Sequence, residues 1–130
     1  MSEKYRAALE TSVALSIDNR MDEALVVLDH ALDRALGESN KVWIRLLAAY
    51  AGTEAEGEGQ YVRARDYYEL ALHSGEDNPW VMYGAALTYA ELGDNESAQS
   101  WFQRTFDLAS TNQDEKLLAL LEREGHLPRP

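Results

Sequence analysis

The feature that most constrains the fold is a repeat in which residues of matching type recur at one fixed spacing. Gly59 and Gly93, Ala64 and Ala98, and Tyr68 and Phe102 each stand 34 positions apart. A period of this length is typical of arrays in which each copy is one small supersecondary unit. One such unit cannot bury its own apolar face, so neighbouring copies must stack to form a continuous core. The repeat therefore predicts an array of stacked units.

A third copy precedes these two in the stretch NRMDEALVVLDHAL. Its Ala24 and Leu28 take the places of Ala64 and Tyr68, but they lie 40 positions upstream instead of 34. In all three copies the apolar residues recur at spacings of three and four, which is the pattern of an amphipathic helix. Each copy is therefore expected to contain helices, and the first spacing contains six surplus residues.

The surplus is expected in a loop inside the second copy. Tyr50 precedes Ala64 by fourteen positions, whereas the matching Tyr89 precedes Ala98 by only nine. Five extra residues therefore fall in the stretch AGTEAEGEGQ and the sixth in the turn before Trp43, and we expect an insertion near residues 51–60. A loop of this length between paired helices could border a binding site.

Residues that favour helix ends divide the chain into helices. Asn19, Gly37, Gly75, Gly93 and Gly125 suit the position just past a helix end, where the backbone is left-handed. The seven helices expected are 3–18, 21–36, 40–54, 60–74, 79–92, 95–109 and 112–124. No strand is expected, so the predicted fold class is all-α.

Helix starts are signalled by side chains that cap the first turn. Asn78 followed by Pro79 is a capping residue with a favourable first helical residue. Asp94 and Thr111 are also good capping residues at the starts of the last two helices. Small residues at the repeated positions, such as Ala64 and Ala98, let paired helices approach closely, so the repeated residues are expected to be core.

The period and its residues resemble the tetratricopeptide repeat, most clearly in NPWVMYGAALTYAELGDNESAQSWFQRTFDLA. Two positions depart from that family, because Ala86 stands where glycine is common and Thr105 where alanine is preferred. The resemblance implies an α-solenoid of three antiparallel helix-turn-helix hairpins and a C-terminal capping helix. We expect one domain over 1–130, with repeats at about 5–38, 39–78 and 79–111, the capping helix at about 112–124 and a tail at 125–130.

The last expected helix breaks the period. Its leucine stripe, Leu117, Leu118, Leu120 and Leu121, is expected to cover the end of the stack, because terminal repeats need such a cap. In the tail, Pro128 and Pro130 prevent further helix.

Composition excludes several classes of function. Cysteine is absent, which rules out disulfides and thiolate metal sites. The net charge of −11 repels phosphate backbones and anionic lipids, so neither nucleic acid nor membrane is an expected partner. No segment approaches the ~20 apolar residues of a membrane span, and a cytoplasmic location is expected.

No catalytic or metal-binding constellation is apparent. His30, His73 and His126 lack the spacing of metal ligands, and each is expected to be a surface or helix-end residue. The alternating Glu54, Glu56 and Glu58 differ from a calcium loop, which uses aspartates at its first positions, so a solvated acidic loop is the preferred interpretation. We expect no enzymatic activity, no cofactor and no bound metal.

The resemblance also implies a binding groove, because the first helix of each hairpin lines the concave face of tetratricopeptide arrays. The residues placed there are Arg6, Leu9, Val13 and Ile17 from the first repeat, Lys41, Ile44, Arg45 and Ala48 from the second, and Trp80, Tyr83, Leu87 and Glu91 from the third. The groove is apolar and aromatic, with Trp80 and Tyr83 as the expected anchors. Packing within the hairpins is the competing interpretation for Val13, Ile17 and Leu87.

A well-known motif of the family is missing from these positions. In chaperone co-factors a clamp of lysine, asparagine and arginine grips the C-terminal carboxylate of a peptide. Leu9 and Val13 stand where its lysine and asparagine would be, Arg45 replaces an asparagine, and Trp80 and Gly84 replace lysine and arginine. Binding to the acidic tails of chaperones is therefore not expected.

Two functions fit these features. The first is an adaptor or scaffold that binds a peptide or helix of another protein, apolar or basic in character, in the concave groove. The alternative is a homo-oligomeric assembly unit that uses the same apolar face, because a large exposed apolar patch is unusual on a monomer. A monomer fits the first and a homodimer the second. A stand-alone relative of a larger repeat protein is a third possibility.

Overall fold

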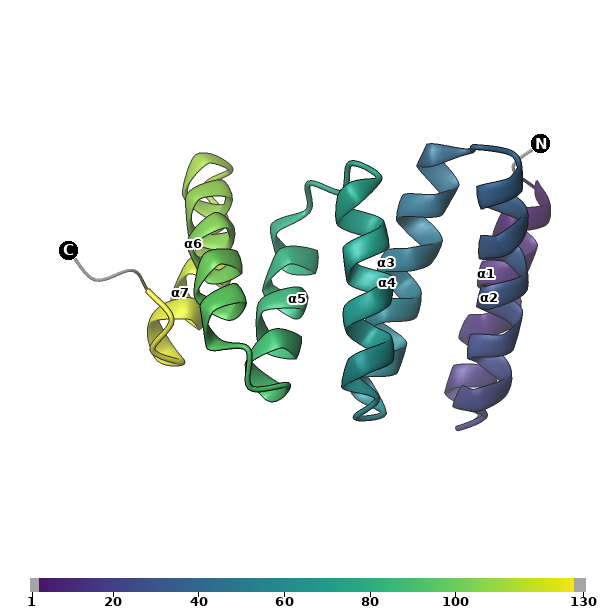
Figure 1. Ribbon diagram of the computed structural model, residues 1–130, viewed down its shortest axis with the longest axis horizontal. Helices are drawn as coiled ribbons and strands as arrows, with labels where there is room; N and C mark the ends of the chain where they lie inside the picture. The colour runs from purple at the N-terminus through teal and green to yellow at the C-terminus, as the bar shows by residue number, and fades with distance from the viewer. Residues whose placement is uncertain (1–2, 128–130) are drawn as a thin grey trace. The chain divides into compact units, whose positions relative to one another are not determined.

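The computed structural model of the protein describes residues 3–127, and it is all-helical over that range (Figure 1). The expected all-α fold is confirmed. Residues 128–130 of the predicted tail lie outside the described part of the chain. The helices are α1 (Glu3–Ile17), α2 (Met21–Gly37), α3 (Lys41–Gly57), α4 (Tyr61–His73), α5 (Pro79–Glu91), α6 (Asn95–Thr111) and α7 (Glu115–Arg123).

The first six helices form three hairpins with the same turn. In α1–α2, α3–α4 and α5–α6 the second helix begins four residues after the last residue of the first. The second turn residue is left-handed in each case, with φ of 61° at Asn19, 73° at Gly59 and 81° at Gly93. Glycine and asparagine tolerate this conformation best, so the predicted role of Asn19 and Gly93 is confirmed.

The end of α2 differs from the prediction. Gly37 is the last helical residue, and Ser39 is the left-handed residue, with φ of 53°. Its amide and that of Asn40 donate to carbonyls of the last turn, Leu36 and Ala35, and these bonds hold the chain in place there. The side chain of Asn40 then accepts a hydrogen bond from the amide of Trp43 and caps α3.

Side chains also cap the starts of α5 and α6, whereas α4 begins without a side-chain cap. Asn78 accepts from the amide of Trp80 at 2.9 Å, and Asp94 accepts from Ser97 at 3.1 Å, as predicted. Thr111 is not a cap. It ends α6, and Asp114 caps α7 instead, since α6 continues two residues beyond the expected end and α7 begins three residues later than expected.

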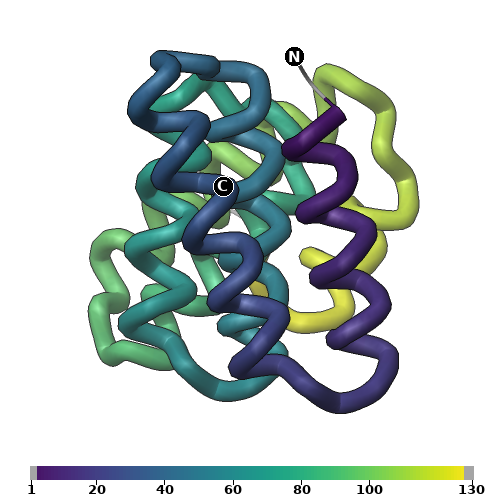
Figure 2. The backbone as a smooth tube through the Cα atoms, turned by 90° about the vertical axis from the view of Figure 1, so that its right-hand side faces the viewer, coloured from purple at the N-terminus to yellow at the C-terminus, as the bar shows by residue number. Residues whose placement is uncertain are grey.

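The chain forms two compact units, residues 1–76 and 77–130. Unit 1 contains α1 to α4, and its main helix contacts are α1 with α2, α2 with α3, and α3 with α4. Figure 2 shows α1 and α2 running side by side as antiparallel neighbours. Leucine and alanine fill this core, and Leu25, Leu28 and Leu47 are fully buried. A single domain over 1–130 remains a prediction.

The predicted insertion near 51–60 is wrong. Residues up to Gly57 belong to α3, and this helix ends seven residues before Ala64, as α5 ends seven residues before Ala98. The surplus lies instead in α2 and α3, which have 17 residues each where α4 and α5 have 13. The segment is helical because its small residues, Ala51, Gly52 and Ala55, are buried.

Gly52 shows the correct register of the second hairpin. A methyl group on Gly52 would lie 2.8 Å from Cδ1 of Tyr68, so the ring of Tyr68 packs directly on the α3 backbone. The separation of Gly52 and Tyr68 along the chain equals that of Ala86 and Phe102 in the third hairpin. The small residue of the first helix and the aromatic ring of the second helix therefore occupy equivalent positions in the two hairpins.

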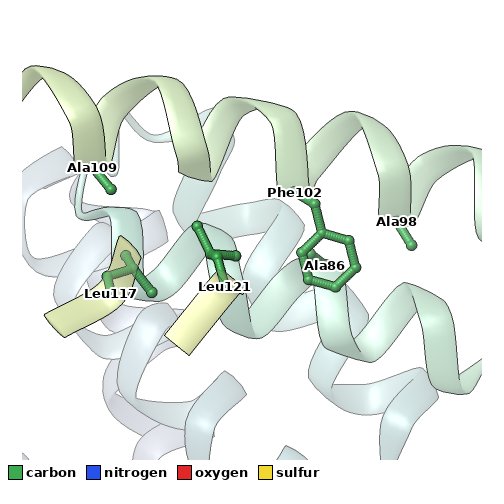
Figure 3. Packing of buried hydrophobic residues seen from close by; sticks show 6 residues of the cluster. All are labelled: Ala86, Ala98, Phe102, Ala109, Leu117 and Leu121. Carbon is green, nitrogen blue, oxygen red and sulfur yellow. The ribbon is translucent and has the colours of Figure 1, made fainter. Parts of the chain in front are cut away.

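Unit 2 contains α5, α6 and α7 around one apolar cluster (Figure 3). Its buried members are Ala86 from α5, Ala98, Phe102 and Ala109 from α6, and Leu117 and Leu121 from α7. Figure 3 shows the leucines of α7 directed toward α6. Leu117 and Leu121 are thus buried against the third hairpin, whereas Leu118 and Leu120 are only partly buried.

Candidate functional site

In unit 1 the helices α1 and α3 lie next to each other and form an exposed surface. The Ser16 hydroxyl of α1 donates to Glu54 of α3 at 3.0 Å, and the rings of Tyr5 and Trp43 pack at 5.6 Å. These two contacts connect the helices at opposite ends. Of the residues predicted from the first repeat, Arg6 and Ile17 are exposed, and Leu9 and Val13 are half-buried.

Two of the four groove residues predicted from α3 cannot contact a partner. Ile44 and Ala48 are buried in the core of unit 1, whereas Lys41 is exposed and Arg45 is half-buried. The prediction aligned Tyr50 with Tyr89, 39 positions later, but the Gly52–Tyr68 pair sets a spacing of 34, so the predicted α3 register is wrong by five residues. At about 100° per residue, a shift of five residues turns the helix face by about 140°. The face of α3 that matches Trp80, Tyr83 and Leu87 therefore carries other residues.

Those residues are Leu46, Ala49 and Thr53, each 34 positions before its counterpart in α5. Leu46 is 41% exposed, although it is a large apolar residue in the middle of a helix. The sequence-based alignment did not find this face. The spacing of the small residues could have revealed it, because Gly52 precedes Tyr68 by the same number of positions as Ala86 precedes Phe102. We define the α1–α3 face as Arg6, Leu9, Val13, Ile17, Leu46, Ala49 and Thr53.

A half-buried acid borders this face. Glu54 accepts the hydrogen bond from Ser16 and lies beside Tyr50. Burial and the negative charge of Glu54 raise the pKa of Tyr50 to about 12. Tyr50 therefore stays neutral at physiological pH, and Glu54 places a carboxylate at this end of the face.

The expected acidic loop is wrong, because its glutamates are part of the helical structure. Glu54 and Glu56 are helical, and Glu58 follows the last residue of α3. Glu56 accepts a 2.6 Å hydrogen bond from the hydroxyl of Tyr68. Burial raises the pKa of Tyr68, and its bond to Glu56 raises it further. Glu54 and Glu56 therefore join α3 to its neighbours α1 and α4.

In unit 2 the corresponding face belongs to α5. Trp80 is 43% exposed, and its indole Nε1 donates to the Asp114 carboxylate at 2.9 Å. Tyr83 is half-buried, and its ring lies 6.3 Å from that of Trp80 and 6.5 Å from that of His126. Leu87 packs against the apolar cluster.

The residues that flank α7 therefore border this α5 face. Asp114 caps the start of α7, and His126 follows its end, stacked on Phe102 at 3.9 Å. Trp80 is thus the most exposed of the three predicted residues Trp80, Tyr83 and Leu87. We define the α5 face as these three residues.

Over residues 3–127, no group of three or more His, Asp or Glu side chains is placed to hold a metal ion. Over the same residues, none of the helices has the length and apolar character needed to cross a membrane.

Comparison with known proteins gives consistent matches. Residues 55–123 match the family described as Tetratricopeptide repeat, a span from α3 to the end of α7. The Photosystem I assembly protein Ycf3 of Rippkaea orientalis is 27% identical over 94 residues, which cover 70% of this chain and 54% of that protein. The Synechococcus elongatus protein of the same name is 28% identical over 95 residues, with the same coverage of both chains. The chain thus spans about half the length of the curated relatives it matches.

A solved structure has the same fold. The crystal structure of the TPR domain of Arabidopsis FLU matches with a TM-score of 0.75 and 19% sequence identity. The match covers 85% of this chain and 98% of the other. At this identity the likeness concerns the fold alone.

Proposed function

The chain belongs to the tetratricopeptide repeat family, and on that premise we propose that it is an adaptor that binds a segment of another protein. The observation that carries this proposal is the α1–α3 face. Leu46 and Ile17, which are 41% and 77% exposed, lie on the first helices of the two hairpins of unit 1. Apolar side chains exposed on one side of a helical unit are typical of protein interaction sites.

The proposed partner is an apolar peptide or helix. Leu9 and Val13 offer half-buried apolar surface between the more exposed Arg6 and Ile17. In unit 2, Trp80 offers a large exposed ring that is already held by Asp114, so little side-chain entropy is lost when it is covered. The net charge of −11 favours a partner that is neutral or basic.

The similarity to Photosystem I assembly proteins supports an assembly role for the adaptor. We propose that it holds a partner during the building of a protein complex, with no catalytic step and no nucleic acid contact. A cytoplasmic location is part of the proposal and is based on the cysteine-free composition.

Affinity capture with matched variants tests the proposal. Leu46→Asp places a charge on the α1–α3 face, and Val62→Asp places the same charge on α4, where Val62 is 56% exposed. Tagged wild type and both variants are incubated with an extract of the source organism, and bound proteins are identified by mass spectrometry. We expect Val62→Asp to retain the wild-type partners and Leu46→Asp to lose at least ~90% of them, since aspartate must be desolvated to bind there.

Trp80→Ala tests the α5 face in the same experiment. If capture by Leu46→Asp and by Trp80→Ala equals that of wild type, neither face binds the partner and the proposal fails. If wild type forms a dimer that Leu46→Asp converts to a monomer, the face joins two copies, which is the alternative function.

A further inference from the structure

The first hairpin has an apolar pocket on its surface. A pocket of about 240 Å³ lies between α1 and α2, with Tyr5, Ala8, Val27 and Ala31 among its lining residues. Lys4 and Arg34 also line it, and Lys4 forms an ion pair with Glu38. Because Glu38 offsets the charge of Lys4, the positive charge that matters at this pocket is that of Arg34, which is exposed at the end of α2.

The second hairpin shows what covers such a surface. The residues 40 positions after Ala8, Val27 and Ala31 are Ala48, Tyr67 and Ala71, and all three are buried. The preceding hairpin covers them, since α2 packs on α3 and the Tyr67 hydroxyl donates to Asp29 of α2. The pocket between α1 and α2 is therefore a stacking surface with the geometry to receive another helical element.

The last helices carry a second stacking surface of opposite charge. A pocket of about 500 Å³ lies between α6 and α7, and its apolar lining includes Phe106, Leu118 and Ala119. Glu115 and Glu122 also line it. Leu118 and Glu122 are four residues apart, so they form one ridge along α7.

We propose that these two surfaces bind each other between copies of the chain, head to tail. The α7 ridge of one copy packs into the α1–α2 pocket of the next, with Leu118 against Ala8 and Ala31 and with Glu122 beside Arg34. Like-charged copies repel at long range, and the opposite charges at these two surfaces select this contact over others.

The partner proposed for the α1–α2 pocket is a second copy of the chain, because the same chain carries both the pocket and the α7 ridge that complements it. A contact between two different surfaces is heterologous, so each bound copy still offers a free pocket and a free ridge. The assembly therefore grows with concentration instead of stopping at a dimer. This contact leaves the α1–α3 face free, so it is independent of the adaptor proposal.

Sedimentation velocity over a wide range of protein concentration tests the proposal. Wild type is expected to change from 14.6 kDa to dimers and larger species as concentration rises. Arg34→Glu blocks the pocket and Ala119→Glu blocks the ridge, and both residues are exposed, so the fold is retained. Each variant alone is expected to remain monomeric at every concentration.

Mixing the two variants provides the decisive result. Arg34→Glu retains an intact ridge and Ala119→Glu an intact pocket, so an equal mixture should form 1:1 dimers that grow no further. Arg104→Glu and Ser100→Glu are controls with the same changes in charge at exposed positions of α6, and they should assemble like wild type. Circular dichroism melting curves confirm that all variants are folded.

Two results would overturn the proposal. One is a wild-type chain that remains monomeric at all concentrations. The other is self-association that persists in both variants or that fails to return in their mixture, because the contact then lies elsewhere.

Discussion

The hairpins α3–α4 and α5–α6 have the same turn, and each contains a small residue and an aromatic ring at the same separation along the chain. The two rings pack differently. In the first, Tyr68 lies directly on the backbone of Gly52, and in the second, Phe102 packs in the cluster that contains Ala86. The Tyr68 hydroxyl donates a hydrogen bond to Glu56 in the last turn of α3, whereas Phe102 stacks on His126 beyond α7. The register between the paired helices is thus the same in both hairpins, while the ring that fills the gap has different neighbours in each.

The largest effect is expected from removing the ring in the third hairpin. Phe102→Ala should lower the free energy of unfolding by about 3–5 kcal/mol, because Phe102 is buried and its loss leaves a cavity. Urea unfolding followed by circular dichroism measures the loss. Hydrogen exchange by mass spectrometry should show faster exchange in α5, α6 and α7 than in α1 to α4. Equal acceleration in both units would contradict a core that is local to unit 2.

A smaller effect is expected from adding a methyl group in the second hairpin. Gly52→Ala places Cβ 2.8 Å from Tyr68. Overpacking costs about 1–3 kcal/mol, offset in part by the better helix propensity of alanine. Thermal unfolding checks this. The double variant Gly52→Ala with Tyr68→Leu should recover stability, since hairpin α1–α2 has Leu28 at this position, paired at the same separation with Ser12.

The reverse change in the third hairpin is the matched control. Ala86→Gly should cost about 1 kcal/mol through lost helix propensity, without relieving any clash. If Gly52→Ala stabilises the chain as much as Ala86→Gly destabilises it, the close approach of Tyr68 has no energetic significance.

The smallest effect is expected at alkaline pH and concerns unit 1. Burial and the hydrogen bond to Asp29 raise the pKa of Tyr67 to about 12, and burial and Glu54 raise that of Tyr50 to about 12. An unfolded tyrosine ionises at about pH 10, so the unfolded state gains stability first. The contribution of these tyrosines to stability is complete below about pH 10 and is lost as pH rises toward about 12.

Urea midpoints measured at about pH 8, 10 and 11 test this expectation. Tyr67→Phe should reduce the alkaline loss, because phenylalanine cannot ionise. A loss of the same size in Tyr67→Phe would show that other groups cause it.

Much of the fold follows from residues whose effect is local. Asn19, Asn78 and Asp94 act within one or two turns of the chain, and each stands at the helix end that its side chain predicted. Gly37 misled because the left-handed residue lies two positions later, at Ser39. Whether Gly37 or Ser39 takes the left-handed conformation depends on where α2 stops packing, and neither residue type decides this alone.

The candidate site was harder to predict because it depends on register. Trp43, Leu46 and Tyr50 have the spacing of a first helix and do lie in one, α3, but their spacing aligns them with α5 in the wrong register, and the polar stretch after them resembles a loop. The end of α3 at Gly57 and the contact between Gly52 and Tyr68 distinguish the two alignments. Exposure of Trp80 agreed with expectation, whereas the aromatic packing of Tyr83 beside His126 depends on where α7 ends, which spacing cannot give.

The order of contacts along the chain has a consequence for biosynthesis. In the described part of the chain, the main helix contacts of each unit join helices that are consecutive in sequence. Proteins built from such local contacts fold quickly, because little loop entropy is lost before a contact forms. Unit 1 is complete at residue 76, so it can fold on the ribosome while the remaining residues are still being translated. The pocket between α1 and α2 is therefore formed before the α7 ridge has been synthesised, so in the proposed head-to-tail contact the pocket is the first of the two surfaces to exist.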